Sequence, residues 1–184
     1  LYILRGNIIR ADDREAAYQA YRQARQHLEA AHQLSSSAET MLWMSAVYGK
    51  LASMRTLKMI YYGARSKALM EEAHALARNN PKFYMLAGAH MMHTPKLFGG
   101  GHARARAFLL RALDLARDWQ ETDALVVRWA LRPEIWAHLA QAAVFAGEAS
   151  EARHYLEKAL RAQPDFGYVI RDIRPQLDVL ENAP

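Results

Sequence analysis

The chain has 184 residues, of which 52% are apolar and 23% charged, and it contains 34 alanines but no cysteine. This composition fits one compact domain or a short array of repeats and argues against a disordered chain. The lack of cysteine excludes disulfide bonds, thiolate zinc sites and cysteine nucleophiles. No stretch of about 18 apolar residues occurs, so we expect no transmembrane segment.

The net charge of +5 is distributed unevenly along the chain. Residues 40–113 contain eleven Lys and Arg but only two Glu, whereas residues 114–184 contain eight basic and twelve acidic residues. All eight methionines also lie within residues 40–113. We therefore expect a partner or ligand to bind in this basic middle segment, and the charge favours an acidic one.

Apolar residues recur at spacings of three and four along the whole chain, which predicts an all-α protein without strands. The expected helices span residues 13–33, 38–55, 57–78, 82–93, 103–118, 124–132, 133–146, 149–161 and 168–180. The serines at 35–37 are expected to cap the second helix, and Pro81 to begin the fourth. Pro175 is expected to interrupt the last helix.

The clearest repeat signature lies in the helix pair over residues 133–164. Its apolar and small residues, in chain order, are Trp136, Leu139, Ala140, Ala143, Ala152, Leu156, Ala159 and Pro164. In residue type and spacing this pair resembles the tetratricopeptide repeat, in which small residues let two helices approach closely. The resemblance implies a right-handed array of about three to four helix pairs, ended by a C-terminal capping helix.

Weaker matches extend the resemblance to most of the chain. Residues 81–118 resemble a second unit through Tyr84, Ala87, Gly88, Ala105, Leu109 and Ala112, with five residues inserted around 95–101. Residues 1–34 look like a slightly shortened unit, and residues 38–78 like a degenerate unit with long helices. We expect a single domain over residues 1–184, with residues 168–184 as its cap.

The block from Pro81 to Gly101 is also similar to divergent bacterial tetratricopeptide proteins. Among these are the periplasmic T-component lipoproteins associated with TRAP transporters and, more remotely, the repeat domain of the regulator of microtubule dynamics family. The chain begins at Leu1, so we expect either that a leader was removed or that the chain was shortened. A periplasmic or exported location is expected in preference to the cytoplasm.

Three histidines could form a metal site. His90 and His93 are one helical turn apart, and His102 follows a loop that could fold back toward them. Together with Met91 and Met92 they would suit copper. The alternative is that Met91 packs in the core and the histidines lie near the negative end of the helix dipole.

The stretch Leu97–Gly101 contains Phe98 and three glycines, and Arg104 and Arg106 follow it. It lacks the Lys-Ser/Thr of a nucleotide-binding loop, but glycine amides at the start of a basic helix could hold an anion. In the alternative, the glycines only let the loop turn while Phe98 fills an apolar gap.

Cations and aromatic residues alternate in Lys58, Tyr61, Tyr62, Arg65 and Lys67. This mixture is compatible with nucleic acid, but no DNA or RNA motif accompanies it, so nucleic acid is not the expected partner. The methionines and aromatic residues of the middle segment could line an adaptable apolar groove, with core packing as the alternative.

Catalytic motifs are lacking, since neither a nucleophile elbow nor a His-Glu-x-x-His sequence occurs. The sequence therefore predicts a non-enzymatic protein-interaction or scaffold protein, without a cofactor, that binds an acidic peptide or partner protein. The expected contacts are Arg55, Lys58, Tyr62, Tyr84, Lys96, Phe98, Arg104 and Arg106. The competing hypothesis is an exported small-ligand or copper-binding protein that acts with a transport system. Self-stacking of the repeats into a homo-oligomer is left open.

Overall fold

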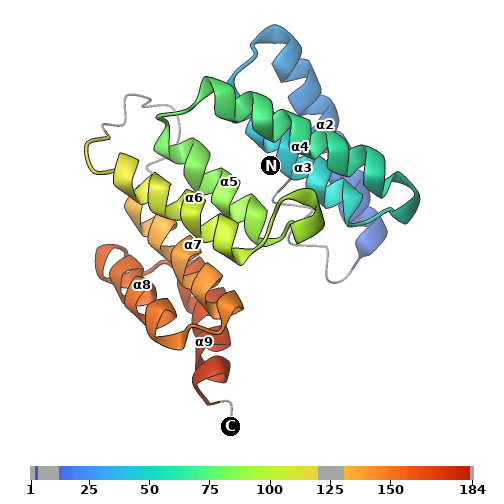
Figure 1. Ribbon diagram of the computed structural model, residues 1–184. Helices are drawn as coiled ribbons and strands as arrows, with labels where there is room; N and C mark the ends of the chain where they lie inside the picture. Colours follow the sequence, from blue (N-terminus) through green and yellow to red (C-terminus); the bar gives the residue numbers. More distant parts are fainter. Residues whose placement is uncertain (1–2, 4–12, 120–130, 183–184) are drawn as a thin grey trace. The chain divides into compact units, whose positions relative to one another are not determined.

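The structure is a computed structural model that describes residue 3 and residues 13–119 and 131–182. Every described element is a helix or helical turn, which confirms the all-α prediction (Figure 1). The chain divides into two compact units, Leu1–Arg78 and Asn79–Pro184. Each is described by itself, and the expectation of one domain over residues 1–184 stays a prediction.

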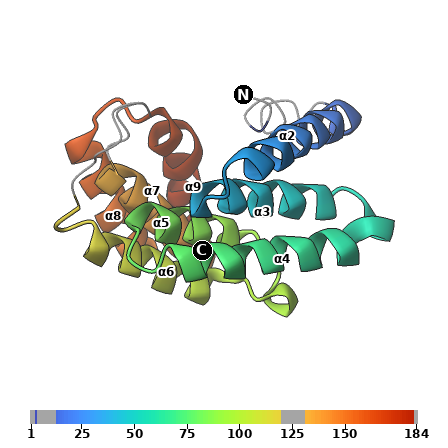
Figure 2. The same cartoon turned by 90° about the horizontal axis from the view of Figure 1, so that it is seen from above.

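The first unit contains α2 (Arg14–Leu34), α3 (Ala38–Ala52), the 3-10 turn η1 (Thr56–Lys58) and α4 (Met59–Leu76). Helix α3 packs against both α2 and α4, and η1 joins α3 to α4 at one end of that pair (Figure 2). Asp13 caps α2 by accepting a hydrogen bond from the Ala16 amide at 2.9 Å. Ser37 accepts from the Thr40 amide at 3.1 Å, which confirms the expected serine cap.

The contact between α3 and α4 is close enough for two buried serines to bond across it. The Ser45 hydroxyl donates to the Ser66 carbonyl, and the Ser66 hydroxyl donates to the Ser45 carbonyl, both at 2.8 Å. Each buried hydroxyl is therefore satisfied by the facing backbone, so the pair costs little to bury.

The second unit contains α5 (Pro81–Met92), the 3-10 turn η2 (Lys96–Phe98), α6 (His102–Leu115), α7 (Leu131–Ala146), α8 (Ala149–Ala162), the π turn η3 (Val169–Ile173) and α9 (Arg174–Glu181). Each helix packs on its neighbour in the chain, and α5 also contacts α7. This pattern is that of a helical repeat array. The helix expected over residues 124–132 lies almost wholly outside the described residues.

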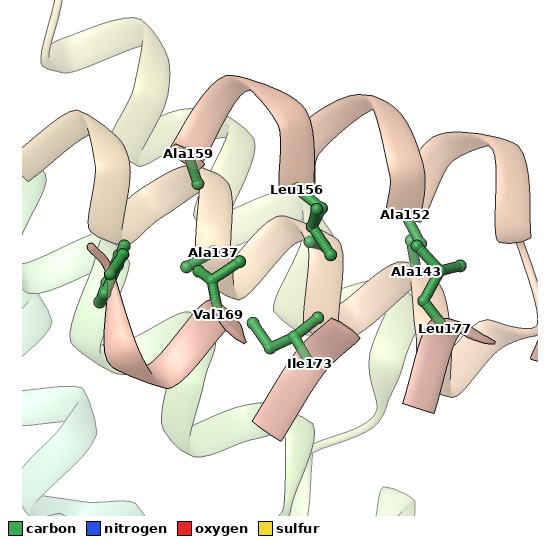
Figure 3. Packing of buried hydrophobic residues seen from close by; sticks show 10 residues of the cluster. Ala137, Ala143, Ala152, Leu156, Ala159, Val169, Ile173 and Leu177 are labelled. Carbon is green, nitrogen blue, oxygen red and sulfur yellow. The ribbon is translucent and has the colours of Figure 1, made fainter. Parts of the chain in front are cut away.

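Alanines dominate the core between α7 and α8, as the repeat signature predicts. Ala140, Ala152 and Ala159 have no exposed surface, and Leu156 packs beside them. The C-terminal segment covers this core with four buried apolar side chains (Figure 3), namely Phe166, Val169, Ile173 and Leu177. The expected cap is confirmed, but it is a π turn that continues directly into α9 rather than a helix broken at Pro175.

Gly88 marks the crossing of α5 and α6. A Cβ added there would lie 2.7 Å from Leu109 Cγ and 3.1 Å from the Ala105 carbonyl oxygen. Leu109 is fully buried, so its side chain is surrounded by other residues of the core. The position therefore needs glycine for packing and not for its backbone angles.

Replacing Gly88 by alanine is expected to lower the free energy of unfolding by about 1–3 kcal/mol, because overpacking outweighs the better helix propensity of alanine. Urea unfolding of G88A, L109A and the double variant measures the coupling. In the L109A background the cost of G88A should largely disappear. An equal cost in both backgrounds would show that Leu109 is not the cause.

Candidate functional site

Three of the predicted contact residues converge in the first unit, around Tyr18 on α2. The guanidinium of Arg55 stacks over the Tyr18 ring, 4.2 Å from its centre. The phenols of Tyr18 and Tyr62 share a hydrogen bond, and Lys58 acts on Tyr18 through its charge. Residues from α2, η1 and α4 therefore meet at one place, although they are up to 44 positions apart in the sequence.

We call Arg22, Arg55 and Lys58 the basic cluster. Arg22 lies one turn after Tyr18 on α2 and acts electrostatically on both tyrosines. Arg55 forms an ion pair with Glu15, whereas Lys58 has no ion pair among the residues that the structure describes. Glu15 therefore offsets one of the three cations, and the cluster keeps a positive excess.

The cations of the basic cluster also affect the pKa values of the tyrosine pair. Burial raises the pKa of Tyr18, but its hydrogen bond with Tyr62 and the nearby cations outweigh burial, so the pKa of Tyr18 lies below its usual value. Burial and the same hydrogen bond raise the pKa of Tyr62. The cations therefore help to stabilise negative charge at the Tyr18 oxygen.

Tyr62 itself belongs to the aromatic core of this unit. Its side chain is buried, and its ring lies 5.8 Å from Tyr48 and 5.4 Å from Tyr61. The Tyr48 hydroxyl donates to Glu29 at 2.6 Å, and burial together with this bond raises the pKa of Tyr48 to about 12. Tyr62 therefore shapes the site from beneath rather than forming its outer surface.

Next to the basic cluster is a continuous exposed segment, residues 55–61. Its apolar members Leu57, Ile60 and Tyr61 are 102%, 75% and 63% exposed. Several large apolar side chains that are exposed next to one another are less common on a protein surface than single ones, so this segment is a candidate contact surface.

The other predicted contacts lie in the second unit, where most have partners. The Arg106 guanidinium forms an ion pair with Glu151, with its Nε donating at 3.2 Å. Arg104 donates to the Gly99 carbonyl at 3.0 Å. The Tyr84 ring packs against Phe108 at 5.5 Å, and Lys96 is exposed in η2. Phe98 lies in η2, and its side chain is outside the description.

The glycine loop is closed by its own hydrogen bonds. The amides of Gly99, Gly100 and Gly101 donate to the carbonyls of Lys96, Pro95 and Met91. Gly99 and Gly101 have φ angles of 83° and 109°, which favour glycine. These amides are already used within the loop, so the structure favours the turn-forming alternative over the anion site.

The histidines of the candidate metal site pack on an aromatic side chain. The rings of His93 and His102 lie 5.8 and 5.5 Å from Phe145, while His90 accepts the Thr94 hydroxyl through its backbone carbonyl. Within the described ranges, no three His, Asp or Glu side chains are placed to hold a metal ion. The copper hypothesis therefore gains no support.

Core packing also accounts for most of the methionines. Seven of the eight are buried, and only Met59 is exposed. The adaptable apolar groove expected from them is thus largely the interior of the two units. Among the described residues, no helix is both long enough and apolar enough to cross a lipid bilayer.

Tyr18 and Arg22 were not among the expected site residues. Their spacing of four places them on one face of α2, but nothing local in the sequence shows which helix that face meets. Leu57 and Ile60 were not expected either, although the sequence contains a signal for them. The run from Leu57 to Tyr61 is apolar at four of five positions, directly beside a helix start.

Comparison with protein families identifies one match, the tetratricopeptide repeat, over residues 133–166. These residues cover α7, α8 and the following turn, the same pair whose alanines form the core described above. The match identifies a tetratricopeptide repeat in this helix pair. No curated protein and no solved structure matches the chain.

Proposed function

We propose that this chain, whose residues 133–166 match the tetratricopeptide repeat, is a non-enzymatic interaction protein that binds an acidic segment of another protein at the basic cluster. Tetratricopeptide units supply surfaces for other proteins rather than reactive groups, which supports the class of partner. The observation that carries the proposal is the convergence of Arg22, Arg55 and Lys58 on the Tyr18–Tyr62 pair.

The cluster suits carboxylates in particular. Arginine presents a fork of donors and lysine a mobile ammonium, and both bind carboxylate oxygens. Arg55 already pairs with Glu15 and stacks on Tyr18, so its contribution is to place positive charge beside the tyrosine pair rather than to bind a new carboxylate by itself. Lys58 and Arg22 are exposed and supply the charge that Glu15 does not offset.

The predicted contacts of the second unit contribute less to this proposal. Arg104 and Arg106 already bind Gly99 and Glu151. An acidic partner would have to displace those groups, which reduces the gain from each contact. We therefore place the acidic segment on the first unit.

The experiment is a selection from a random peptide library displayed on phage, followed by fluorescence anisotropy with the enriched peptides. We expect enrichment of Asp and Glu, and a loss of at least about tenfold in affinity for the K58E and R22E variants. Affinity should also fall as salt is raised, since the cluster is solvent-exposed.

The matched control is K67E, because Lys67 is also exposed on α4 but pairs with Glu71 at 3.8 Å and lies outside the cluster. It should bind like the wild type. Selected peptides without acidic residues, or equal affinities for K58E and K67E, would contradict the proposal.

A further inference from the structure

The exposed apolar residues beside the basic cluster need an explanation of their own. Residues 55–61 are all exposed, and four of the seven are apolar. Leu57 projects fully from η1, and Ile60 and Tyr61 follow in the first turn of α4. A run of this kind is unusual on a protein surface unless another molecule covers it.

The apolar side chains lie on one face of the chain. Leu57, Ile60 and Tyr61 are spaced by three and four, so they form a stripe along the start of α4. We call these three residues the apolar stripe. Arg65 continues the same face one turn after Tyr61 and is exposed. Lys58 stands beside the stripe and belongs to the basic cluster.

The stripe and two cations of the basic cluster, Arg55 and Lys58, belong to the same exposed run of residues. Tyr61 of the stripe packs its ring 5.4 Å from Tyr62, and Tyr62 shares a hydrogen bond with Tyr18. Lys58, between Leu57 and Met59, acts on Tyr18 through its charge. Apolar and cationic groups thus alternate within about two helical turns.

We infer that the acidic segment bound at the basic cluster is amphipathic, with apolar side chains that cover Leu57, Ile60 and Tyr61 and acidic side chains that meet Lys58 and Arg65. The inference rests on the proposed function and specifies its partner. Burial of the stripe supplies affinity that does not depend on salt, and the cations set the orientation.

An anionic membrane is the main competing occupant of such a surface, since it also attracts apolar and cationic side chains. The charges at this end of the unit favour a protein. Glu15 pairs with Arg55, so a carboxylate stands beside the cations of the cluster. A protein segment can place its acidic side chains opposite Lys58 and Arg65 and its apolar side chains on the stripe, whereas a membrane surface has no such fixed spacing of charges.

The test uses the full chain and the acidic peptides enriched by the phage selection as probes. The L57S/I60S variant removes the two aliphatic side chains of the stripe and leaves Tyr61 and the Tyr18–Tyr62 pair unchanged. The control is L76S, because Leu76 is 64% exposed at the other end of α4. We expect L57S/I60S to bind at least about tenfold more weakly than the wild type, and L76S to bind equally well. The residual affinity of the wild type at high salt should vanish in L57S/I60S.

Each contrary result has a separate meaning. If L57S/I60S binds like the wild type while K58E is weakened, the inference is overturned and the proposed function stands. If K58E also binds like the wild type, both fall. If vesicles of phosphatidylserine and phosphatidylcholine sediment the wild type but not L57S/I60S, and the peptides do not compete, the stripe contacts a membrane and the inference is overturned.

Discussion

Replacing Ile173 by alanine should lower the free energy of unfolding of the second unit by about 2–5 kcal/mol. Ile173 has no exposed surface and packs in the core formed by α7, α8 and the C-terminal segment (Figure 3). Truncation of the Ile173 side chain leaves a cavity. Neighbouring alanines such as Ala137 and Ala140 cannot fill it, because a methyl side chain has no conformations that reach into the space.

Urea unfolding in a W43F background would measure this effect, because the remaining tryptophans all lie in residues 79–184. The matched control is I170A, in the same π turn, since Ile170 is 36% exposed. It should cost less than about 1 kcal/mol. Equal losses for I173A and I170A would show that the C-terminal segment does not cover the core.

Acidification should destabilise the second unit through His138. The Nδ1 atom of this residue is buried without a hydrogen-bond partner, and its ring lies 5.9 Å from Tyr168. Burial and, to a smaller extent, the charge of His93 lower the pKa of His138 to about 4. The unfolded chain therefore binds this proton more tightly than the folded chain does.

The direction of the pH effect follows from the lower pKa of His138 in the folded state. Above pH 6.5 His138 is neutral in both states and has no effect on the pH dependence. Between pH 6.5 and 4 the unfolded state is preferentially protonated, so the free energy of unfolding falls as pH falls. The full loss at pH 4 is about 3 kcal/mol, from 1.36 kcal/mol per pKa unit.

Urea unfolding in the W43F background at pH 7, 5.5 and 4 checks this, with W43F/H138Q as the comparison. The glutamine variant should lose less stability on acidification than its parent. Glu134 acts in the opposite direction, because burial raises its pKa and favours the protonated folded state at low pH. An H138Q variant with an unchanged pH profile would exclude His138 as the source.

Local features of the fold follow closely from the sequence. Three helices begin where capping rules place their N-termini, at Asp13, Ser37 and Pro81. Such a start is predictable because a cap depends only on residues within one turn. The alanines of α7 and α8 are at the crossing because their spacing repeats within one helix pair. The residues in contact between neighbouring helices are close together in the sequence, so the repeat signature is enough to predict these contacts.

The candidate site was only partly predictable. Arg55, Lys58 and Tyr62 were expected as contacts, and the structure places them together. Their neighbour Tyr18 was missed, because its contact with Tyr62 spans 44 residues and depends on how α2 packs near α4. Tyr62 was also expected to contact the partner but is buried, since helical spacing alone does not show which face a third helix covers.

The sequence by itself determined the helical class, the capped helix ends and the repeat over residues 133–166, since all of these depend on spacing within one or two helices. Only the tertiary structure decided which charges remain available. It tied Arg106 to Glu151 and Arg104 to Gly99, and it left Lys58 exposed beside Tyr18. The physical reason is that the field at a site depends on distances between groups far apart in the chain, which composition and periodicity do not contain.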